Sequence, residues 1–182
     1  MIISITGTPG TGKTSISKLL KERGFEIVNF NKIALENNFI IGKDKKRDTY
    51  IVDIKKFNKY AKENYSQKKI IFIEGHLSHL IKIVDKVIIL RCHPDELRKN
   101  LSKKGWNKQK IKENLEAEIL DVILCEALSL HPPKNIFEIN TTTRSIKDVF
   151  SSIIEIIENN FKVIKKYNIG KIDWSEEILK DF

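Results

Sequence analysis

Residues 7–14 read Gly7-Thr8-Pro9-Gly10-Thr11-Gly12-Lys13-Thr14 and match the P-loop pattern G-x-x-x-x-G-K-[ST] at every fixed position. The apolar run at residues 1–5 predicts a short buried strand before the loop, and residues 15–23 have the period of an amphipathic helix. A strand, a glycine-rich turn and a helix in this order are the setting in which the pattern binds phosphate. The stretch therefore predicts an α/β fold.

The residue types of this loop fit a polyphosphate. Gly7, Gly10 and Gly12 have no Cβ, so backbone N–H groups can approach the ligand closely, and the positive end of the following helix adds to the attraction. We expect Lys13 to reach the β- and γ-phosphates and the Thr14 hydroxyl to ligate Mg²⁺. The alternative is a glycine-rich turn that binds nothing, which gives the lysine and the threonine no packing reason to be there.

The composition describes an ordinary globular domain. The chain has 182 residues, of which 41% are hydrophobic and 31% charged, enough for one domain with its own core. The formal net charge of +9 comes mainly from scattered lysines. Two interpretations stay open: a surface that faces RNA or the ribosome, or the composition of a biased genome.

Cysteine usage and hydropathy indicate the cytoplasm. Cys92 and Cys125 form no metal-binding pattern, and we expect them to be reduced thiols. The first strand begins at Met1, so no signal peptide is expected, and no apolar run approaches the roughly 20 residues that span a bilayer. We therefore expect a cytoplasmic protein with no membrane partner.

Polar residues follow two further apolar strands. Residues 69–76 read Lys69-Ile70-Ile71-Phe72-Ile73-Glu74-Gly75-His76 and place an acid and a histidine at the ligand-binding edge of the sheet. Glu74 is a candidate for the Walker-B acid that holds Mg²⁺ or its waters. His76 either positions a water or the acceptor phosphate, or is a packed edge histidine. Arg91 ends the next strand and is a candidate contact for the transferred phosphate; the alternative is a salt bridge to Glu74 or Asp85.

The rest of the chain alternates strands and helices. Residues 29–52 are polar, have only a short helical pattern, and are expected to cover a ligand; a plain solvated loop is the alternative. Residues 162–182 show no clear core face and are expected either to pack on the body or to meet a partner. Further strands are expected at residues 25–28 and 135–139, and helices at residues 53–60, 94–101, 108–130 and 145–161.

Motifs spread along the chain resemble those of one family. Besides the P-loop they are Ile73-Glu74-Gly75-His76, Leu90-Arg91-Cys92-His93-Pro94, Lys104-Gly105-Trp106, Glu113-Asn114-Leu115-Glu116-Ala117-Glu118-Ile119, Glu138-Ile139-Asn140-Thr141-Thr142 and Asp173-Trp174. Together they resemble the adenylate kinase isoenzyme-six family in its archaeal form. The match covers nearly the whole chain, and the helix with the Glu-Asn-x-Glu-Ala-Glu-Ile pattern is its most specific part besides the P-loop.

The resemblance implies a P-loop NTPase fold in a single domain of residues 1–182. Such a fold has three layers, with a parallel five-stranded sheet between helices. By position, residues 29–52 would be the insert that binds a nucleoside monophosphate, residues 103–113 a short lid, and residues 162–182 a C-terminal tail.

The resemblance also implies an activity, which is transfer of the ATP γ-phosphate to AMP with Mg²⁺. Family members are similar in acting as ATPases in maturation of the small ribosomal subunit, which implies a small-subunit ribosomal protein and the 16S rRNA precursor as partners, and no DNA. A metabolic kinase and an assembly-factor ATPase would share the same active-site residues, so the sequence does not separate them.

The expected site residues fall into four groups. Leu35 stands where many family members have an arginine, which leaves Arg47 and Arg91 as candidates for the AMP phosphate. The metal ligands would be Thr14 and Glu74. The catalytic residues would be Lys13, Glu74, His76 and Arg91, and the ATP contacts Gly10, Gly12, Lys13, Thr14, Ser15, Lys104 and Arg144.

Overall fold

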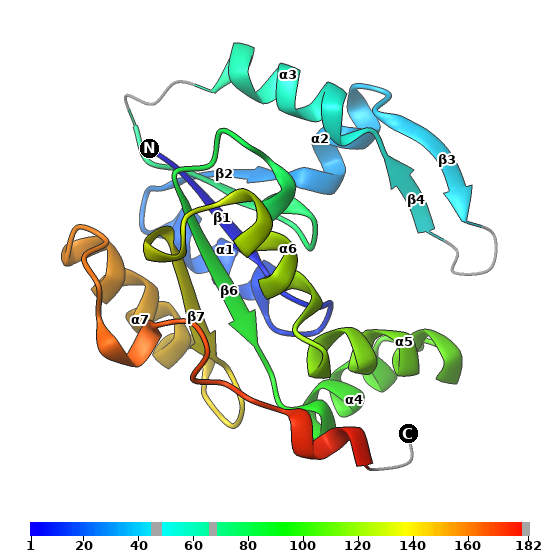
Figure 1. Ribbon diagram of the computed structural model, residues 1–182. Helices are drawn as coiled ribbons and strands as arrows, with labels where there is room; N and C mark the ends of the chain where they lie inside the picture. The colour runs from blue at the N-terminus through cyan, green and yellow to red at the C-terminus, as the bar shows by residue number, and fades with distance from the viewer. Residues whose placement is uncertain (45–48, 66–68, 180–182) are drawn as a thin grey trace.

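A five-stranded parallel sheet forms the centre of the molecule (Figure 1). The computed structural model describes residues 1–44, 49–65 and 69–179. The strand order is β2-β5-β1-β6-β7, and all four pairings are parallel, which confirms the predicted fold class. The strands are β1 (Ile2–Thr6), β2 (Glu26–Asn29), β5 (Ile71–Glu74), β6 (Lys86–Arg91) and β7 (Ile136–Asn140).

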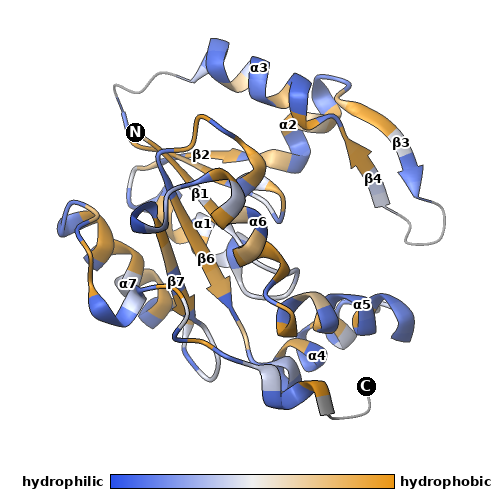
Figure 2. Cartoon of the chain, viewed as in Figure 1, coloured by the Kyte–Doolittle hydropathy of each residue, from blue (hydrophilic) through white to orange (hydrophobic). Residues whose placement is uncertain are grey.

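Helices cover both faces of this sheet, because successive residues of each strand point to opposite sides and both sides are apolar (Figure 2). On one face Ile3 and Phe72 pack against α1 (Lys13–Glu22) and α7 (Ile146–Glu158). On the other, Ile2 and Ile73 belong to the cluster formed with α2 (Phe30–Glu36), α3 (Ile54–Asn64) and α6 (Val122–Leu130). The arrangement has the three layers that the sequence predicts.

The remaining elements lie at the ends of the sheet. Helices α4 (Pro94–Lys103) and α5 (Lys108–Ile119) share a small apolar cluster of their own, which includes Leu97, Leu101 and Leu115. Short 3₁₀ turns are η1 (Ser78–Leu80), η2 (Pro133–Asn135), η3 (Lys165–Tyr167) and η4 (Ser175–Leu179). Among the described residues, no helix combines the length and the apolar character needed to cross a membrane.

Strand order decides where the P-loop lies. The chain passes from β1 outward to β2, returns through β5, and then crosses β1 to reach β6. The order therefore reverses around β1, and the loop after β1 emerges in the middle of the C-terminal edge. Open α/β sheets bind ligands at such a switch point.

The insert contains more structure than the sequence predicts. Its short helical pattern is confirmed as α2, which Asn29 caps by accepting a hydrogen bond from the Lys32 N–H at 2.9 Å. An antiparallel hairpin follows, which we did not expect, and it projects beyond the sheet (Figure 1). Its strands are β3 (Ile40–Asp44) and β4 (Thr49–Val52).

The single helix predicted for residues 108–130 is wrong. The structure has α5 and α6, with Asp121 between them in the left-handed conformation at φ +53°. The Asp121 carboxylate pairs with Arg91, on β6. The helix breaks where a residue contacts a distant part of the chain. The apolar pattern of the sequence continues across the break, so it does not predict it.

The C-terminal tail packs on the body, which is one of the two outcomes expected from the sequence. Tyr167 is buried, and its hydroxyl donates to Glu155 Oε2 at 2.6 Å. Further along, the Gly170 N–H donates to Glu138 Oε2 at 2.8 Å, and the Trp174 ring lies 5.0 Å from the His93 ring, centroid to centroid.

Candidate functional site

A cleft of about 1130 Å³ opens at the C-terminal edge of the sheet. Its floor is formed by the P-loop after β1 and by Glu74, Gly75 and His76 at the end of β5. One wall comes from the insert and includes Leu35, Ile40, Tyr50 and Val52. The opposite wall comes from α4, α5 and their connection and includes Asn100, Lys104, Trp106 and Lys110.

The P-loop takes its shape from close backbone contacts. A Cβ on Gly7, whose φ is +139°, would lie 2.4 Å from the Leu90 carbonyl oxygen, so only glycine fits there. Gly12 is the N-cap of α1 at φ +97° and has no side chain with which to cap the helix. Thr14 and Ser15, in the first turn of α1, line the cleft, as does Gly10. The helix N-terminus is thus directed at the ligand space, as the motif predicts.

Lys13 lies in this loop, where the motif places it. Its ammonium donates to the carbonyl oxygens of Gly7 at 2.7 Å and Thr8 at 3.0 Å, and the side chain is buried. Burial is the main reason that the pKa of Lys13 falls to about 8; Glu74 acts to raise that pKa and Lys104 to lower it. A phosphate beside the ammonium would favour its charged form, so this position suits an anionic ligand.

Thr14 and Glu74 come together as the sequence predicts. The Thr14 hydroxyl donates to Glu74 Oε1 at 3.4 Å, and the carboxylate is buried at the cleft floor. Hydroxyl and carboxylate oxygens are the hard ligands that Mg²⁺ prefers, and Mg²⁺ completes its shell with waters and substrate phosphates. The donor set of these two residues therefore fits the metal.

Asn29 is a site residue that the sequence analysis missed. Its Nδ2 donates to Glu74 Oε2 at 2.8 Å, so it fixes the carboxylate from the side opposite Thr14. Asn29 is the last residue of β2 and pairs in register with Glu74. The signal that identified Glu74, a polar residue at the end of a strand, was present here too.

His76 lines the cleft beside the P-loop. Burial, followed by the charge of Lys13 and the nearby His79, lowers the pKa of His76 to about 4. Its imidazole is therefore neutral near pH 7, with one nitrogen able to donate and the other to accept a hydrogen bond. The position and the charge state are those that a water- or phosphate-positioning group requires.

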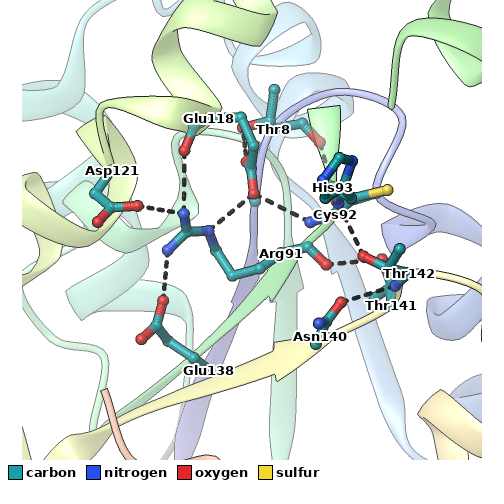
Figure 3. A network of polar contacts seen from close by, with 12 residues as sticks. Thr8, Arg91, Cys92, His93, Glu118, Asp121, Glu138, Asn140, Thr141 and Thr142 are labelled. Atoms are coloured by element: carbon teal, nitrogen blue, oxygen red, sulfur yellow. Dashed lines mark hydrogen bonds and ion pairs between the residues drawn. The ribbon is translucent and has the colours of Figure 1, made fainter. Parts of the chain in front are cut away.

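The structure contradicts the role expected of Arg91. Its side chain is 2% exposed, and it is not among the described residues that line the cleft. The guanidinium instead donates to three carboxylates: Nε to Glu118 Oε1 at 2.8 Å, Nη1 to Glu138 Oε1 at 2.6 Å, and Nη2 to Asp121 (Figure 3). Burial alone would lower the pKa of Arg91, but these carboxylates outweigh it and raise that pKa. Arg91 is thus an internal cation and not a phosphate contact.

The alternative of a salt bridge was right in kind and wrong in its partners. Glu74 interacts with Thr14 and Asn29, and Asp85 accepts a hydrogen bond from the Ile2 backbone N–H at 2.7 Å. The true partners of Arg91 lie 27 to 47 residues further along the chain.

The other expected nucleotide contacts lie at their expected positions only in part. Lys104 lines the cleft, and with Lys110 it lies over the Trp106 ring, at 5.9 and 4.5 Å from the centroid. Arg144 is exposed on the turn after β7, where its guanidinium donates to the Asn140 carbonyl at 3.1 Å and to Ser152 Oγ at 2.7 Å. It is not among the described lining residues, and Arg47 lies outside the described residues.

Comparisons with known proteins agree with this geometry. A family model described as an AAA domain matches residues 3–121. A protein named "Putative adenylate kinase" from Methanocaldococcus jannaschii is 38% identical over 178 residues, which cover 97% of this chain and 94% of that one. A protein of the same name from Archaeoglobus fulgidus is 39% identical over 178 residues, covering 98% and 94%.

Among solved structures, thymidylate kinase from Candida albicans superposes with a TM-score of 0.58 at 13% identity, covering 87% of this chain and 91% of that one. This similarity shows a shared fold. Identity near 40% over almost the full length shows more, and it confirms the resemblance found in the sequence. The chain therefore belongs to the archaeal adenylate kinase family that includes these two relatives.

Proposed function

We propose that this protein is an adenylate kinase, which transfers the γ-phosphoryl group of ATP to AMP. The observation that carries the proposal is the position of the P-loop between two different walls of one cleft, the insert on one side and the α4–α5 connection on the other. Such a cleft has a place for a donor and an acceptor on either side of the P-loop. Membership of the family supports the same reading.

The insert wall suits the base of a nucleoside monophosphate. Leu35, Ile40 and Val52 offer apolar surface, and the Tyr50 ring offers a flat face for a purine. The hairpin that carries Tyr50 is joined to the body through α2 and α3. Movement of the insert would close this wall over AMP and exclude water.

The opposite wall and the P-loop suit ATP. Lys13 and the N-terminus of α1 would bind the phosphates, and Lys104 and Lys110 add positive charge from the lid side. When bound by Thr14 and Glu74, Mg²⁺ would offset the charge of the donor phosphates. Transfer then needs no covalent intermediate, because these residues only have to hold the two phosphates in line.

ATP hydrolysis is a second candidate activity, and the observation that favours it is His76. A neutral imidazole at the cleft floor can accept a hydrogen bond from a water beside the γ-phosphate. The role in small-subunit maturation implied by the family resemblance would use this hydrolysis, and a net charge of +9 suits a partner rich in RNA.

A screen of acceptors tests the proposed kinase activity. ADP formation is measured with ATP alone and with ATP plus AMP, GMP, CMP or shikimate, and Lys13→Ala from the same purification controls for contaminating kinases. We expect AMP to raise the rate of ATP consumption above that of every other acceptor. If AMP adds nothing to the rate with ATP alone, the kinase proposal fails and hydrolysis becomes the principal activity.

A further inference from the structure

Glu118 lies where three parts of the molecule meet. It is near the end of α5 and is 3% exposed. Its Oε2 accepts a hydrogen bond from the Thr8 hydroxyl in the P-loop at 2.5 Å (Figure 3). Its Oε1 accepts from Arg91 Nε at 2.8 Å and from the Cys92 backbone N–H at 3.0 Å. One carboxylate thus joins α5, the P-loop and the end of β6.

Thr8 passes this contact on to the phosphate-binding residues. It is itself 2% exposed and is not among the described residues that line the cleft. Its carbonyl oxygen accepts hydrogen bonds from Lys13 Nζ at 3.0 Å and from the Thr11 hydroxyl at 2.9 Å. The side chain of Thr8 is therefore held by Glu118, while its backbone helps to hold Lys13.

Helix α5 also carries part of the lid wall. Lys110, Asn114 and Ala117 line the cleft from the same helix that ends near Glu118. The helix ends at Ile119, and Asp121, two residues further on, pairs with Arg91, so this end of α5 is bound to the sheet. One helix thus carries both the residues that line the cleft and the end that is bound to the sheet.

We propose that Glu118 is a positioning residue for phosphoryl transfer. It fixes Thr8 relative to the lid helix, so that the P-loop backbone and Lys13 keep the geometry that the transferred phosphate requires. The inference rests on the proposed function. Its physical basis is that a buried carboxylate with three charged or polar donors has a single favourable position, and that position also fixes Thr8.

A purely structural role is the alternative, in which Glu118 does no more than neutralise Arg91. Glu138 provides a matched control, because it is 1% exposed and also pairs with buried Arg91. Unlike Glu118, its carboxylate has no hydrogen bond to a P-loop residue among the described parts of the chain. Loss of either carboxylate should lower the melting temperature, because each leaves a buried charge less compensated. Only the loss of Glu118 should alter catalysis per folded molecule.

The test is a double-mutant cycle on kcat and on the KM for ATP. Glu118→Gln keeps the size of the side chain but changes its charge and acceptors, and Thr8→Val removes the hydroxyl. We expect each to lower kcat by about tenfold or more, since small displacements of catalytic groups have effects of this order. The double variant should be no slower than the slower single variant. Thr8→Ser, which keeps the hydroxyl, should restore kcat to within about twofold of the wild type.

The control predicts a different pattern. Glu138→Gln should lower the melting temperature and leave kcat of the folded fraction unchanged, and its effects should combine additively with those of Thr8→Val. The inference is overturned if Glu118→Gln keeps wild-type kcat, if its effect multiplies with that of Thr8→Val, or if Glu138→Gln slows turnover equally.

Affinity for MgATP separates this inference from the proposed function. It is measured by titration calorimetry on the wild type, Glu118→Gln and Thr8→Val. A wild type that binds MgATP but does not phosphorylate AMP would contradict the kinase proposal alone. The double-mutant cycle would then be measured on the dissociation constant for MgATP in place of kcat. Unchanged affinity in both variants, together with unchanged turnover, would overturn the role of Glu118.

Discussion

Lys13 is buried, so its removal relieves the cost of a buried charge, while the carbonyl oxygens of Gly7 and Thr8 lose a donor. Because these two effects oppose each other, we expect little net change in the stability of the fold. Burial already works against its charge, as the lowered pKa of about 8 shows. We expect Lys13→Ala to lower kcat by about 10² to 10³ or more, because a preorganised donor to the developing charge is lost. Circular dichroism should give a melting temperature close to that of the wild type. A Lys13→Ala variant that turns over ATP at the wild-type rate would contradict the P-loop assignment.

Glu74 should act mainly on the chemical step. Through the metal, its carboxylate would act where charge develops, while the P-loop still binds the phosphates. We expect Glu74→Gln to lower kcat by about 10²-fold or more, with a smaller loss of MgATP affinity. Asn29→Ala provides the matched comparison, and its effect on kcat should be smaller because Asn29 only orients the carboxylate. Wild-type kcat in Glu74→Gln at saturating Mg²⁺ would remove Glu74 from the metal site.

His79 should make the fold sensitive to acid. Its ring is buried, with Nδ1 3.0 Å from the Thr6 hydroxyl and Nε2 2.9 Å from Glu126. Burial lowers the pKa of His79, against the opposing hydrogen bond and charge of Glu126, and His131 adds a smaller lowering effect. The histidine of the unfolded chain has the ordinary pKa of about 6.5, so below that pH it binds a proton that His79 of the folded chain does not bind. The free energy of unfolding therefore falls as the pH falls.

Melting temperatures between pH 7.5 and pH 5 test this expectation. The melting temperature of the wild type should fall over this range. In a chain of this size, each kcal/mol lost from the free energy of unfolding lowers the melting temperature by about 2–4 °C. His79→Gln should be less stable at pH 7.5 but should lose less on acidification, because glutamine does not titrate. Parallel curves for the two proteins would show that His79 is not the source of the acid sensitivity.

Arg91 shows what the sequence could not predict at this scale. Thr14 and Glu74 lie together as the sequence predicts, because a P-loop threonine and a polar residue at a strand end have positions set by local structure. The direction of the Arg91 side chain depends instead on Glu118, Asp121 and Glu138, which come from other elements. Two buried glutamates and the partly exposed Asp121 hold the guanidinium inside the molecule, and no local sequence pattern predicts this arrangement.

The β3–β4 hairpin is the element that sequence patterns missed. Its strands are only five and four residues long, and no residue of either is buried, so they lack the apolar alternation of a core strand. The central strands were predictable because they are buried on both faces and read as continuous apolar runs. The break at Asp121 was missed for the opposite reason, since apolar residues continue on both sides of it.

The hairpin should determine affinity for AMP. Tyr50 lines the cleft from β4, whereas Ile41 lies on β3, is 65% exposed, and is not among the described lining residues. We expect Tyr50→Ala to raise the KM for AMP by about tenfold, since an aromatic stacking partner contributes on the order of 1–3 kcal/mol. The KM for ATP should change little, and Ile41→Ala should leave both constants unchanged. Equal increases for the two nucleotides would contradict the assignment of this wall to the acceptor.

At the scale of the whole molecule, the sheet and its layers follow from the sequence, but the cleft depends on contacts between distant segments. Residues 29–52 and 103–113 are separated by about a quarter of the chain, yet they line opposite walls of one cavity. The tail was undecided from the sequence, and it packs through Gly170 on Glu138 and through Trp174 on His93. The proposed activity is therefore a property of the assembled cleft, which would hold ATP and AMP together for direct transfer of the phosphate.

The most direct test of that claim is to follow the terminal phosphate itself. ATP labelled in its γ-phosphate is incubated with AMP, Mg²⁺ and the wild-type protein, and the products are separated. If the cleft transfers the phosphate directly, label appears in ADP at the rate at which AMP disappears, with little free phosphate. Label found only in inorganic phosphate, at a rate independent of AMP, would contradict direct transfer.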